Sequence, residues 1–266
     1  MELTLNRPHE VVVLDRCASE MARVVALLRE SAVRRAPAGM AVDEPGITGV
    51  LSGAAPILWA YEGVEAARLA SLVKSAPEVD EVYVDQRCAA AADALLGSGE
   101  WGLHDVVDQQ VLRPGKQGWP AMSTDYAIEA AGPADMHLVR RALATAYQLP
   151  VRTIEAGYPD DFFVKAAPVR LYVARSESGE VIGTIGHRQQ GDAAMIFGLS
   201  VRSDHRRRHV ASALLATAVR SAADDGAAML HGLSCNATRR LAAGHGFARV
   251  GGWLYLLRDS RAAACG

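Results

Sequence analysis

After residue 124 the pattern of apolar and polar positions predicts strands and helices in a regular succession. Short segments that are continuously apolar, or that alternate with a period of two, predict the strands 126–130, 170–174, 181–188, 193–201, 229–234 and 252–257. Apolar positions spaced three or four apart predict the helices 133–148, 210–223 and 236–244, with a shorter helical or irregular piece over 151–163. The order β-α-α-β-β-β-α-β-α-β is typical of an α/β or α+β fold with helices on both faces of a mixed sheet.

The first half of the chain repeats part of this pattern. It contains the predicted strands 11–14, 57–61, 81–85 and 106–113 and the predicted helices 18–31 and 64–73. The segment Leu95–Trp101 matches Leu241–Phe247 over the same span, and a closing strand follows both. The repeat predicts a second copy of the same fold.

A linker separates the two copies. Residues 114–123 hold two prolines and two glycines and have no periodic apolar pattern. We therefore expect two domains, 1–115 and 124–260, joined by a linker over 116–123 and followed by a tail over 261–266. A chain of 266 residues, half of them hydrophobic, is long enough for each domain to bury its own core.

Composition and charge narrow the class of protein. With 28 basic and 30 acidic residues the net charge is −2, which gives no reason to expect nucleic-acid or membrane partners. The first residues lack the apolar core of a signal peptide, and no apolar run reaches the roughly 18 residues of a membrane span. The four cysteines have no CxxC spacing, so we expect reduced thiols and a cytoplasmic protein. The eight histidines show no metal-binding spacing, so no metal is expected.

The most informative chemistry lies between the strand 193–201 and the helix 210–223. Arg206, Arg207 and Arg208 occupy the turn directly before the helix. A helix start presents unpaired backbone N–H groups and the positive end of the helix dipole, so such a turn is suited to a phosphate or pyrophosphate. Taken alone, three arginines would rather indicate a solvated basic loop or a nucleic-acid contact. Their place between this strand and this helix favours the phosphate site.

The same turn carries a resemblance to a known family. Arg206-x-x-His209-x-Ala211 is similar to the Arg/Gln-x-x-Gly-x-Gly/Ala signature of the GNAT superfamily of acyl-CoA-dependent N-acyltransferases. The family's asparagine-led helix ending in Gly-Phe is matched by Asn236 and Gly246-Phe247. The likeness covers residues 124–260. It implies a GNAT-like mixed-sheet domain here and a degenerate GNAT-like copy in the first half.

The resemblance implies an N-acetyltransferase that moves an acetyl or other acyl group from acetyl-CoA to a primary amine of a small molecule or peptide. Two alternatives stay open: a catalytically silent acyl-CoA-binding regulatory protein, and an enzyme of the same fold that uses another acyl-CoA. The two related halves would allow a monomer as well as a homodimer.

The resemblance also implies which residues bind coenzyme A: Leu199, Ser200, Val201, Arg206, Arg207, Arg208, His209, Val210, Ala211, Ser212 and Asn236. Leu199 and Val201 would bind the pantetheine arm through main-chain groups, beside a bulge or close backbone approach expected at Gly198. His209 replaces the usual glycine, and its β-carbon is tolerated if the local φ is negative. Asn236 is either a plain helix cap or a cap that also contacts the coenzyme.

The usual proton-transfer groups of the family are missing. Ala242 stands where many members carry a tyrosine, and residues 194–200 include no carboxylate. The remaining candidates are Ser200, His231, Ser234, Cys235 and Tyr255, of which lone strand histidines are more often structural. We assign no catalytic residue. Attack by a neutral amine needs mainly positioning and a route for proton loss, so transfer is still compatible with the sequence.

Two further segments bear on function. The first half has Tyr61-Glu-Gly-Val-Glu65 where the arginine turn should stand, and its acids repel a pyrophosphate, so we expect no coenzyme there. Acceptor choice in the family depends on the segment 147–163. Its aromatic and acidic residues Tyr158, Phe162, Phe163, Glu155, Asp160 and Asp161 would suit an amine with an apolar body; alternatively the aromatics pack a helix and the acids face solvent.

Overall fold

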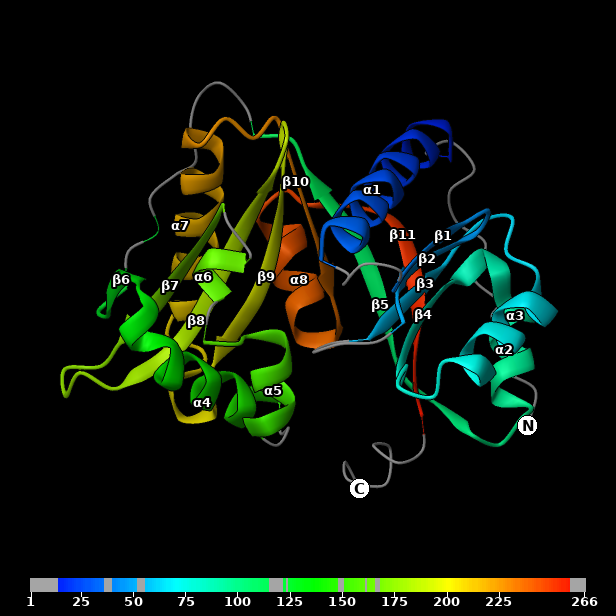
Figure 1. The fold of residues 1–266 in the computed structure, drawn as a ribbon. Coiled ribbons are helices and arrows are strands. Elements are labelled where there is room, and N and C mark those ends of the chain that lie inside the picture. Colours follow the sequence, from blue (N-terminus) through cyan, green and yellow to red (C-terminus); the bar gives the residue numbers. More distant parts are fainter. Residues whose placement is uncertain are drawn as a thin grey trace.

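One mixed sheet of eleven strands runs through the described part of the molecule (Figure 1). The computed structural model describes residues 14–35, 40–51, 56–114, 122, 124–147, 151–160, 162–165 and 168–258. The strands are β1 (Ala41–Glu44), β2 (Ile47–Val50), β3 (Ile57–Ala60), β4 (Glu81–Asp85), β5 (Trp101–Leu112), β6 (Ala127–Ala131), β7 (Val169–Arg175), β8 (Val181–Gln190), β9 (Ala193–Val201), β10 (Met229–Ser234) and β11 (Ala248–Arg258). Their order in the sheet is β1-β2-β3-β4-β11-β5-β10-β9-β8-β7-β6.

The helices are α1 (Leu14–Arg35), α2 (Ala66–Ser75), α3 (Ala89–Leu96), α4 (Met136–Tyr147), α5 (Val151–Gly157), α6 (Phe162–Lys165), α7 (Val210–Asp224) and α8 (Asn236–Gly244). Single 3₁₀ turns precede α3, α4 and the arginine turn. They are η1 (Gln86–Cys88), η2 (Pro133–Asp135) and η3 (Ser203–His205).

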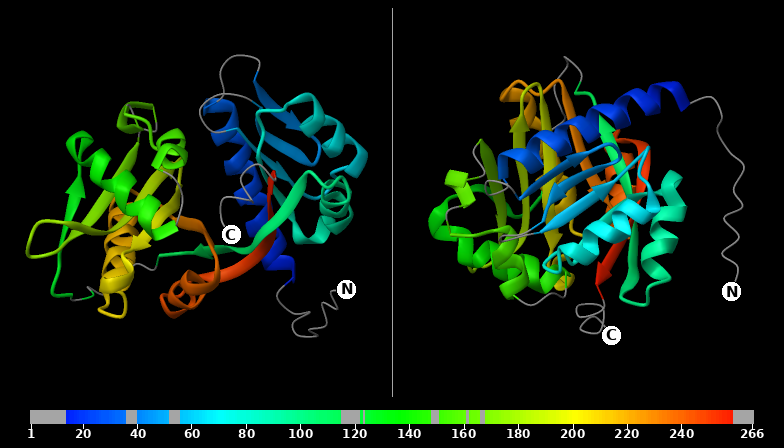
Figure 2. Two further views of the ribbon diagram at one scale, coloured as in Figure 1. Left: turned by 90° about the horizontal axis from the view of Figure 1, so that it is seen from below. Right: turned by 45° about the vertical axis from the view of Figure 1, so that its right-hand side comes forward.

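Two strands in the middle of the sheet cross from one half of the chain to the other. β5, the last strand of the first half, lies between β10 and β11 of the second half and pairs antiparallel with both. β11 in turn lies between β4 and β5 of the first half, again antiparallel to both. The view from below shows these two strands bridging the halves (Figure 2). Each half therefore completes the sheet of the other.

Helices cover both faces of the sheet. One face packs against α7 in the second half and against α2 and α3 in the first half. The opposite face carries α1 and α4. Ala193 and Phe197 lie four residues apart on β9, so their side chains point to the same face of the sheet. Ala193 belongs to the core cluster under α1, whereas Phe197 packs against the cluster under α4. Between α1 and the α4–α6 group no helix of the described residues covers this face (Figure 1).

The elements predicted after residue 124 are present, and 193–201 and 229–234 have the predicted ends. In the first half the predicted strand at 11–14 is wrong at Leu14, which lies in α1, while 11–13 fall outside the described residues. The hairpin of β1 and β2 was not predicted, because β1 ends in two acids and β2 contains a glycine, which are residue types depleted in strands. Of the predicted linker 116–123, the structure describes Met122 alone. The other linker residues lie outside the described part of the chain, which resumes at Thr124.

Candidate functional site

β9 and β10 separate in the middle of the second half. They pair in parallel only between residues 193–195 and 229–231. Beyond these pairs β9 stays bound to β8, and β10 stays bound to β5. A gap therefore opens between two neighbouring strands in the centre of the sheet, with the edge of β9 from Ile196 onward facing it.

A bulge in β9 lies at this gap, as the glycine in the strand predicted. Between Phe197 and Ser200 three residue steps along β9 match two along β8. Gly198 has a φ of +66°, a conformation that glycine adopts without strain. A β-carbon at Gly198 would also lie 2.8 Å from the Tyr158 hydroxyl, so the site needs glycine on both counts.

A cavity of about 140 Å³ fills the gap. On the α7 face its wall includes Leu215, Leu241, Ala242 and Phe247, and on the opposite face it includes Tyr147, Phe197 and Cys235. Gln110 joins this wall from β5, so both halves of the chain contribute. Because side chains from both faces line it, the cavity connects the two sides of the sheet. Its mostly apolar wall suits a slender chain.

The turn before α7 leaves backbone donors unused. α7 begins at Val210, and the amides of Arg207 to Ser212 find no backbone acceptor among the described residues. Unpaired N–H groups and the helix dipole make such a turn attractive to an anion. Val210 itself is buried, which anchors the helix start against the sheet.

The backbone of this turn differs from one expectation. His209 is the N-cap of α7, with φ +60°, and it makes no side-chain capping bond. We expected its β-carbon to be tolerated at negative φ, and this condition is not met. The residue holds the left-handed conformation that a glycine at this position of the signature would favour. Arg207, with φ +61°, shares the strain.

The three arginines of the turn are exposed and carry charge that no described acid neutralises. Arg206 Nε donates to the Val201 carbonyl at 3.2 Å, and an Arg208 terminal nitrogen donates to the Tyr126 hydroxyl at 3.0 Å. Arg202 differs, because it pairs with Asp204 and Glu180 at 2.7 and 3.0 Å. Positive charge is therefore concentrated next to the unpaired amides.

The other residues predicted to bind a coenzyme lie along β9 and at the start of α8. Leu199, Ser200 and Val201 follow the point where β10 leaves β9. The Leu199 carbonyl accepts a hydrogen bond from Tyr147 at 3.3 Å. The Ser200 hydroxyl is buried and lies 2.8 Å from the Thr184 hydroxyl, so its side chain is used internally.

Asn236 does not cap α8. The N-cap is Cys235, whose backbone N–H donates to the Thr238 hydroxyl at 3.1 Å, so a residue one turn into the helix satisfies the cap. Asn236 is the first helical residue, and its side chain lies outside the described part of the structure. The prediction of a capping role was therefore wrong by one position.

Two of the catalytic candidates are structural. His231 is 1% exposed, its Nε2 lies 2.9 Å from the Gln190 amide oxygen, and burial lowers its pKa to about 4. Tyr255 stacks on Tyr83 with ring centroids 4.5 Å apart. Ser234 and Cys235 line the cavity, and burial raises the pKa of the Cys235 thiol, so it is protonated at neutral pH.

Tyr147 is a site residue that sequence reasoning did not single out. It ends α4, lines the cavity and donates to β9 immediately after the bulge. Although 45% of Tyr147 is exposed, the protein around its hydroxyl raises its pKa, so the hydroxyl keeps its proton at neutral pH. A tyrosine in the last turn of an amphipathic helix has no sequence signal that separates it from packing residues, because only the fold brings it to β9.

The aromatic residues of 147–163 mostly pack against one another. Phe162 is buried and lies 5.1 Å from Tyr158 and 6.1 Å from Phe197, measured between ring centroids. Asp160 pairs with Arg140 at 2.7 Å, and Asp161 lies outside the described residues. This agrees with the packing interpretation for the aromatic set.

The corresponding turn of the first half is built differently. Glu62 and Glu65 flank Gly63 before α2, and Glu62 pairs with Arg87 at 3.4 Å. Gly46, in the β1–β2 hairpin, packs directly on the Val64 backbone nitrogen, where an added β-carbon would overlap. The space beside the Val64 backbone N–H is therefore occupied by Gly46 of the same chain.

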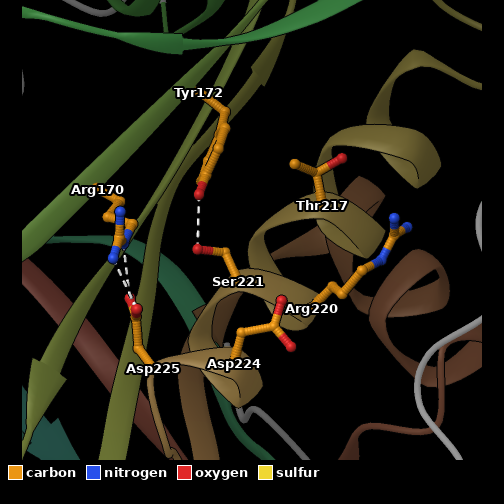
Figure 3. Close-up of a pocket in the computed structure, with 7 residues that line it drawn as sticks. All are labelled: Arg170, Tyr172, Thr217, Arg220, Ser221, Asp224 and Asp225. Atoms are coloured by element: carbon orange, nitrogen blue, oxygen red, sulfur yellow. Dashed lines mark hydrogen bonds and ion pairs between the residues drawn. The ribbon is translucent and has the colours of Figure 1, made fainter.

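A second cavity, of about 340 Å³, lies between β7 and α7, on the α7 face (Figure 3). Four residues of its wall bond to one another: Arg170 forms a bidentate pair with Asp225 at 2.7 Å, and the Tyr172 hydroxyl donates to Ser221 at 2.6 Å. It shares no residue with the cavity between β9 and β10.

Within the described residues no helix is long and apolar enough to cross a membrane. In the same residues no three His, Cys, Asp or Glu side chains gather where they could hold a metal ion.

Comparisons with known proteins agree with this geometry. Residues 137–249 match the model of the acetyltransferase (GNAT) family. A GCN5-related N-acetyltransferase from Kribbella flavida superposes with a TM-score of 0.62 at 13% identity, over 89% of this chain and 95% of the other. A tandem GNAT protein from the clavulanic acid biosynthesis pathway gives 0.52 at 12% identity, over 90% and 94%. At these identities the structures show a shared fold. No curated protein sequence matches the chain.

Proposed function

We propose that this chain, whose residues 137–249 belong to the acetyltransferase (GNAT) family, moves the acetyl group of acetyl-CoA to a primary amine of a small molecule or peptide. The observation that carries the proposal is the gap between β9 and β10. It gives a thioester a route through the sheet, and the arginine turn follows at the end of β9.

The residues at the gap fit each part of the coenzyme. The pyrophosphate would accept hydrogen bonds from the amides of 207–212, among them those of His209, Val210, Ala211 and Ser212, and would be neutralised by Arg206, Arg207 and Arg208. The pantetheine arm would lie along Leu199, Ser200 and Val201, on the edge of β9 from which β10 has separated. Asn236, at the start of α8, would make a further contact with the coenzyme.

The proposal extends to domain organisation. Residues 1–115 and 124–260 would be two GNAT-like domains, of which only the second binds coenzyme. Support comes from the first half's strand–turn–helix unit, where Glu62 and Glu65 replace the arginines and Gly46 occupies the space beside Val64. β5 of the first half pairs with β10 of the second, and β11 of the second half pairs with β4 of the first, an arrangement we call the exchange of β5 and β11. Because of this exchange, the two domains would share one sheet.

The chemistry asks little of acid and base groups. A neutral amine attacks the thioester carbon, the new C–N bond replaces the C–S bond, the amine nitrogen loses a proton, and the sulfur gains one. Tyr147 is the tyrosine on the cavity wall, and like any tyrosine it is protonated at neutral pH, so its hydroxyl would donate to the departing sulfur. It would do from α4 what the family's tyrosine does from the position of Ala242.

Isothermal titration with acetyl-CoA tests the proposal. We expect micromolar binding that falls at least about tenfold when Arg206→Glu and Arg208→Glu are combined, because both cations face the same anion. Glu62→Lys with Glu65→Lys is the matched control in the first half and should leave affinity unchanged. Absence of binding at high micromolar acetyl-CoA would refute coenzyme binding, and equal effects of both variants would refute the single-site arrangement.

A second function has one observation in its favour. Residues 194–200 include no carboxylate and Ala242 no hydroxyl, which would suit a protein that binds acyl-CoA without transferring the acyl group. Release of free thiol from acetyl-CoA in the presence of primary amines separates the two. Thiol release above the amine-free rate supports transfer, and binding without release supports the silent alternative.

A further inference from the structure

Arg188, on β8, carries a charge that the described part of the molecule leaves without a counterion. Its side chain is half-buried, and its Nε is fully buried without a hydrogen-bond partner. Burial lowers its pKa, and the titratable group acting on it is the neutral Tyr158 hydroxyl. A partly desolvated cation without a counterion is costly, so its position needs an explanation.

Arg140 shows how this chain treats a buried arginine that serves packing. It is 8% exposed, donates to the Tyr158 carbonyl at 2.6 Å and pairs with Asp160 at 2.7 Å. Both ends of its guanidinium are satisfied by the protein. Arg188 lies on the same face of the sheet and stacks over the Phe197 ring, but its Nε has no hydrogen-bond acceptor and no described acid pairs with it, so packing satisfies it only in part.

Arg188 lies beside the gap. Its guanidinium carbon is 5.9 Å from the centroid of Phe197, whose ring lines the cavity and precedes the bulge at Gly198. The side chains of Phe197 and Tyr147 reach the cavity on this face, whereas α7 and its arginine turn lie on the other. Arg188 therefore lies next to a residue of the cavity wall, on the face of the sheet opposite the arginine turn.

We propose that Arg188 binds an anionic group of the acceptor, which makes the acceptor an amine that also carries a carboxylate, such as an amino acid. The inference rests on the proposed transfer function. A single guanidinium matches a monoanion in charge and binds both carboxylate oxygens through its planar fork. A carboxylate on Arg188 would leave the amine of the same molecule beside Phe197 and the bulge, where the thioester would arrive.

Binding of the transfer products tests this without requiring turnover. Protein saturated with coenzyme A is titrated with N-acetylphenylalanine and with N-phenethylacetamide, which has the same body and no carboxylate. We expect the carboxylate compound to bind at least about tenfold more tightly to the wild-type protein. Arg188→Met should remove the preference, Arg188→Lys should keep part of it, and Arg141→Met, an exposed arginine on α4, should keep it fully.

The same variants report on folding. Because Arg188→Met removes an uncompensated charge, we expect an unchanged coenzyme affinity and a melting temperature that rises by about 2 °C or more. A fall in melting temperature would show that Arg188 is held by the protein itself and would overturn the proposal. So would a wild-type protein without carboxylate preference, or a preference that survives in Arg188→Met.

Two further outcomes are separable. N-acetyl-β-alanine and the phosphate ester of N-acetylethanolamine compare a carboxylate with a phosphate on similar bodies, and tighter binding of the phosphate would overturn the choice of carboxylate. If the wild-type protein fails to bind coenzyme A at all, the proposed function fails. If coenzyme A binds and the carboxylate preference is absent, only the inference on Arg188 fails.

Discussion

His209 combines two properties that conflict at the level of one residue. Its position at the start of α7 requires a left-handed backbone, and its side chain has the β-carbon that this conformation disfavours. Histidine is among the residues that tolerate the left-handed region best after glycine, which explains why the turn still forms. The strain persists because Val210, the first residue of α7, is buried against the sheet and fixes the direction of the chain.

His209→Gly should relieve this strain and clear the approach to the amides of 207–212. The gain of about 1 kcal/mol from the backbone is partly offset by the greater freedom of glycine in the unfolded chain. We expect unchanged or slightly higher stability in urea unfolding and tighter binding of acetyl-CoA by calorimetry.

Ser203→Gly is the control for His209→Gly, because Ser203 is exposed in the same loop at an ordinary φ. It should lower the free energy of unfolding by about 0.5–1 kcal/mol without improving coenzyme affinity. If His209→Gly destabilises as much as this control, the left-handed conformation does not strain the protein.

Two units of the same element order, strand–turn–helix, show how far sequence reaches. In 193–224 the glycine in the strand predicted the bulge, and the arginines predicted the exposed cationic turn. In 57–75 the acids predicted a turn hostile to phosphate, but not that Gly46 fills the space beside Val64, since the hairpin contributing it lies outside the unit. Local sequence patterns therefore predicted local conformation, whereas contacts between elements far apart in the sequence were not predicted.

The same limit applies to the side chains of the site. Tyr147 and Gln110 line the cavity from α4 and β5, and Arg188 lies over Phe197 from β8. No spacing in the sequence joins these three residues. The exchange of β5 and β11 could not be read from strand patterns either. An apolar strand has the same pattern whether it pairs within its own half or with the other half.

The exchange leads to a prediction about the two halves as separate chains. Residues 14–121 and 122–258, produced singly, should show no cooperative thermal transition, because β10 lacks β5 and β4 lacks β11 as neighbours. Produced together they should purify as a one-to-one complex with a single transition. The fragment 122–258 melting cooperatively and binding acetyl-CoA on its own would contradict this.

For the whole molecule, buried groups set how stability depends on pH. His231 lies under α1 near the junction of the halves, and its pKa is held near 4, against about 6.5 when exposed. Between these values the unfolded chain binds a proton that the folded protein excludes, so stability is present above pH 6.5 and is lost as the pH falls.

His231→Gln should remove this dependence. The wild-type protein is expected to lose up to about 3 kcal/mol of unfolding free energy between pH 6.5 and pH 4 through this group. The variant should show a flatter profile in urea unfolding over that interval, and His137→Gln, on the exposed side of α4, should keep the wild-type slope. Equal slopes in all three proteins would show that His231 does not titrate on unfolding.

The position of β11 in the sheet also sets an order of events during synthesis. The ribosome makes β11 after the other described strands, although β11 fills the place between β4 and β5. Until it emerges, β4 and β5 each have an open edge on the nascent chain, and such edges are sites of wrong pairing. We therefore expect the first half to stay incomplete during synthesis and the sheet to become continuous only when β11 inserts between β4 and β5.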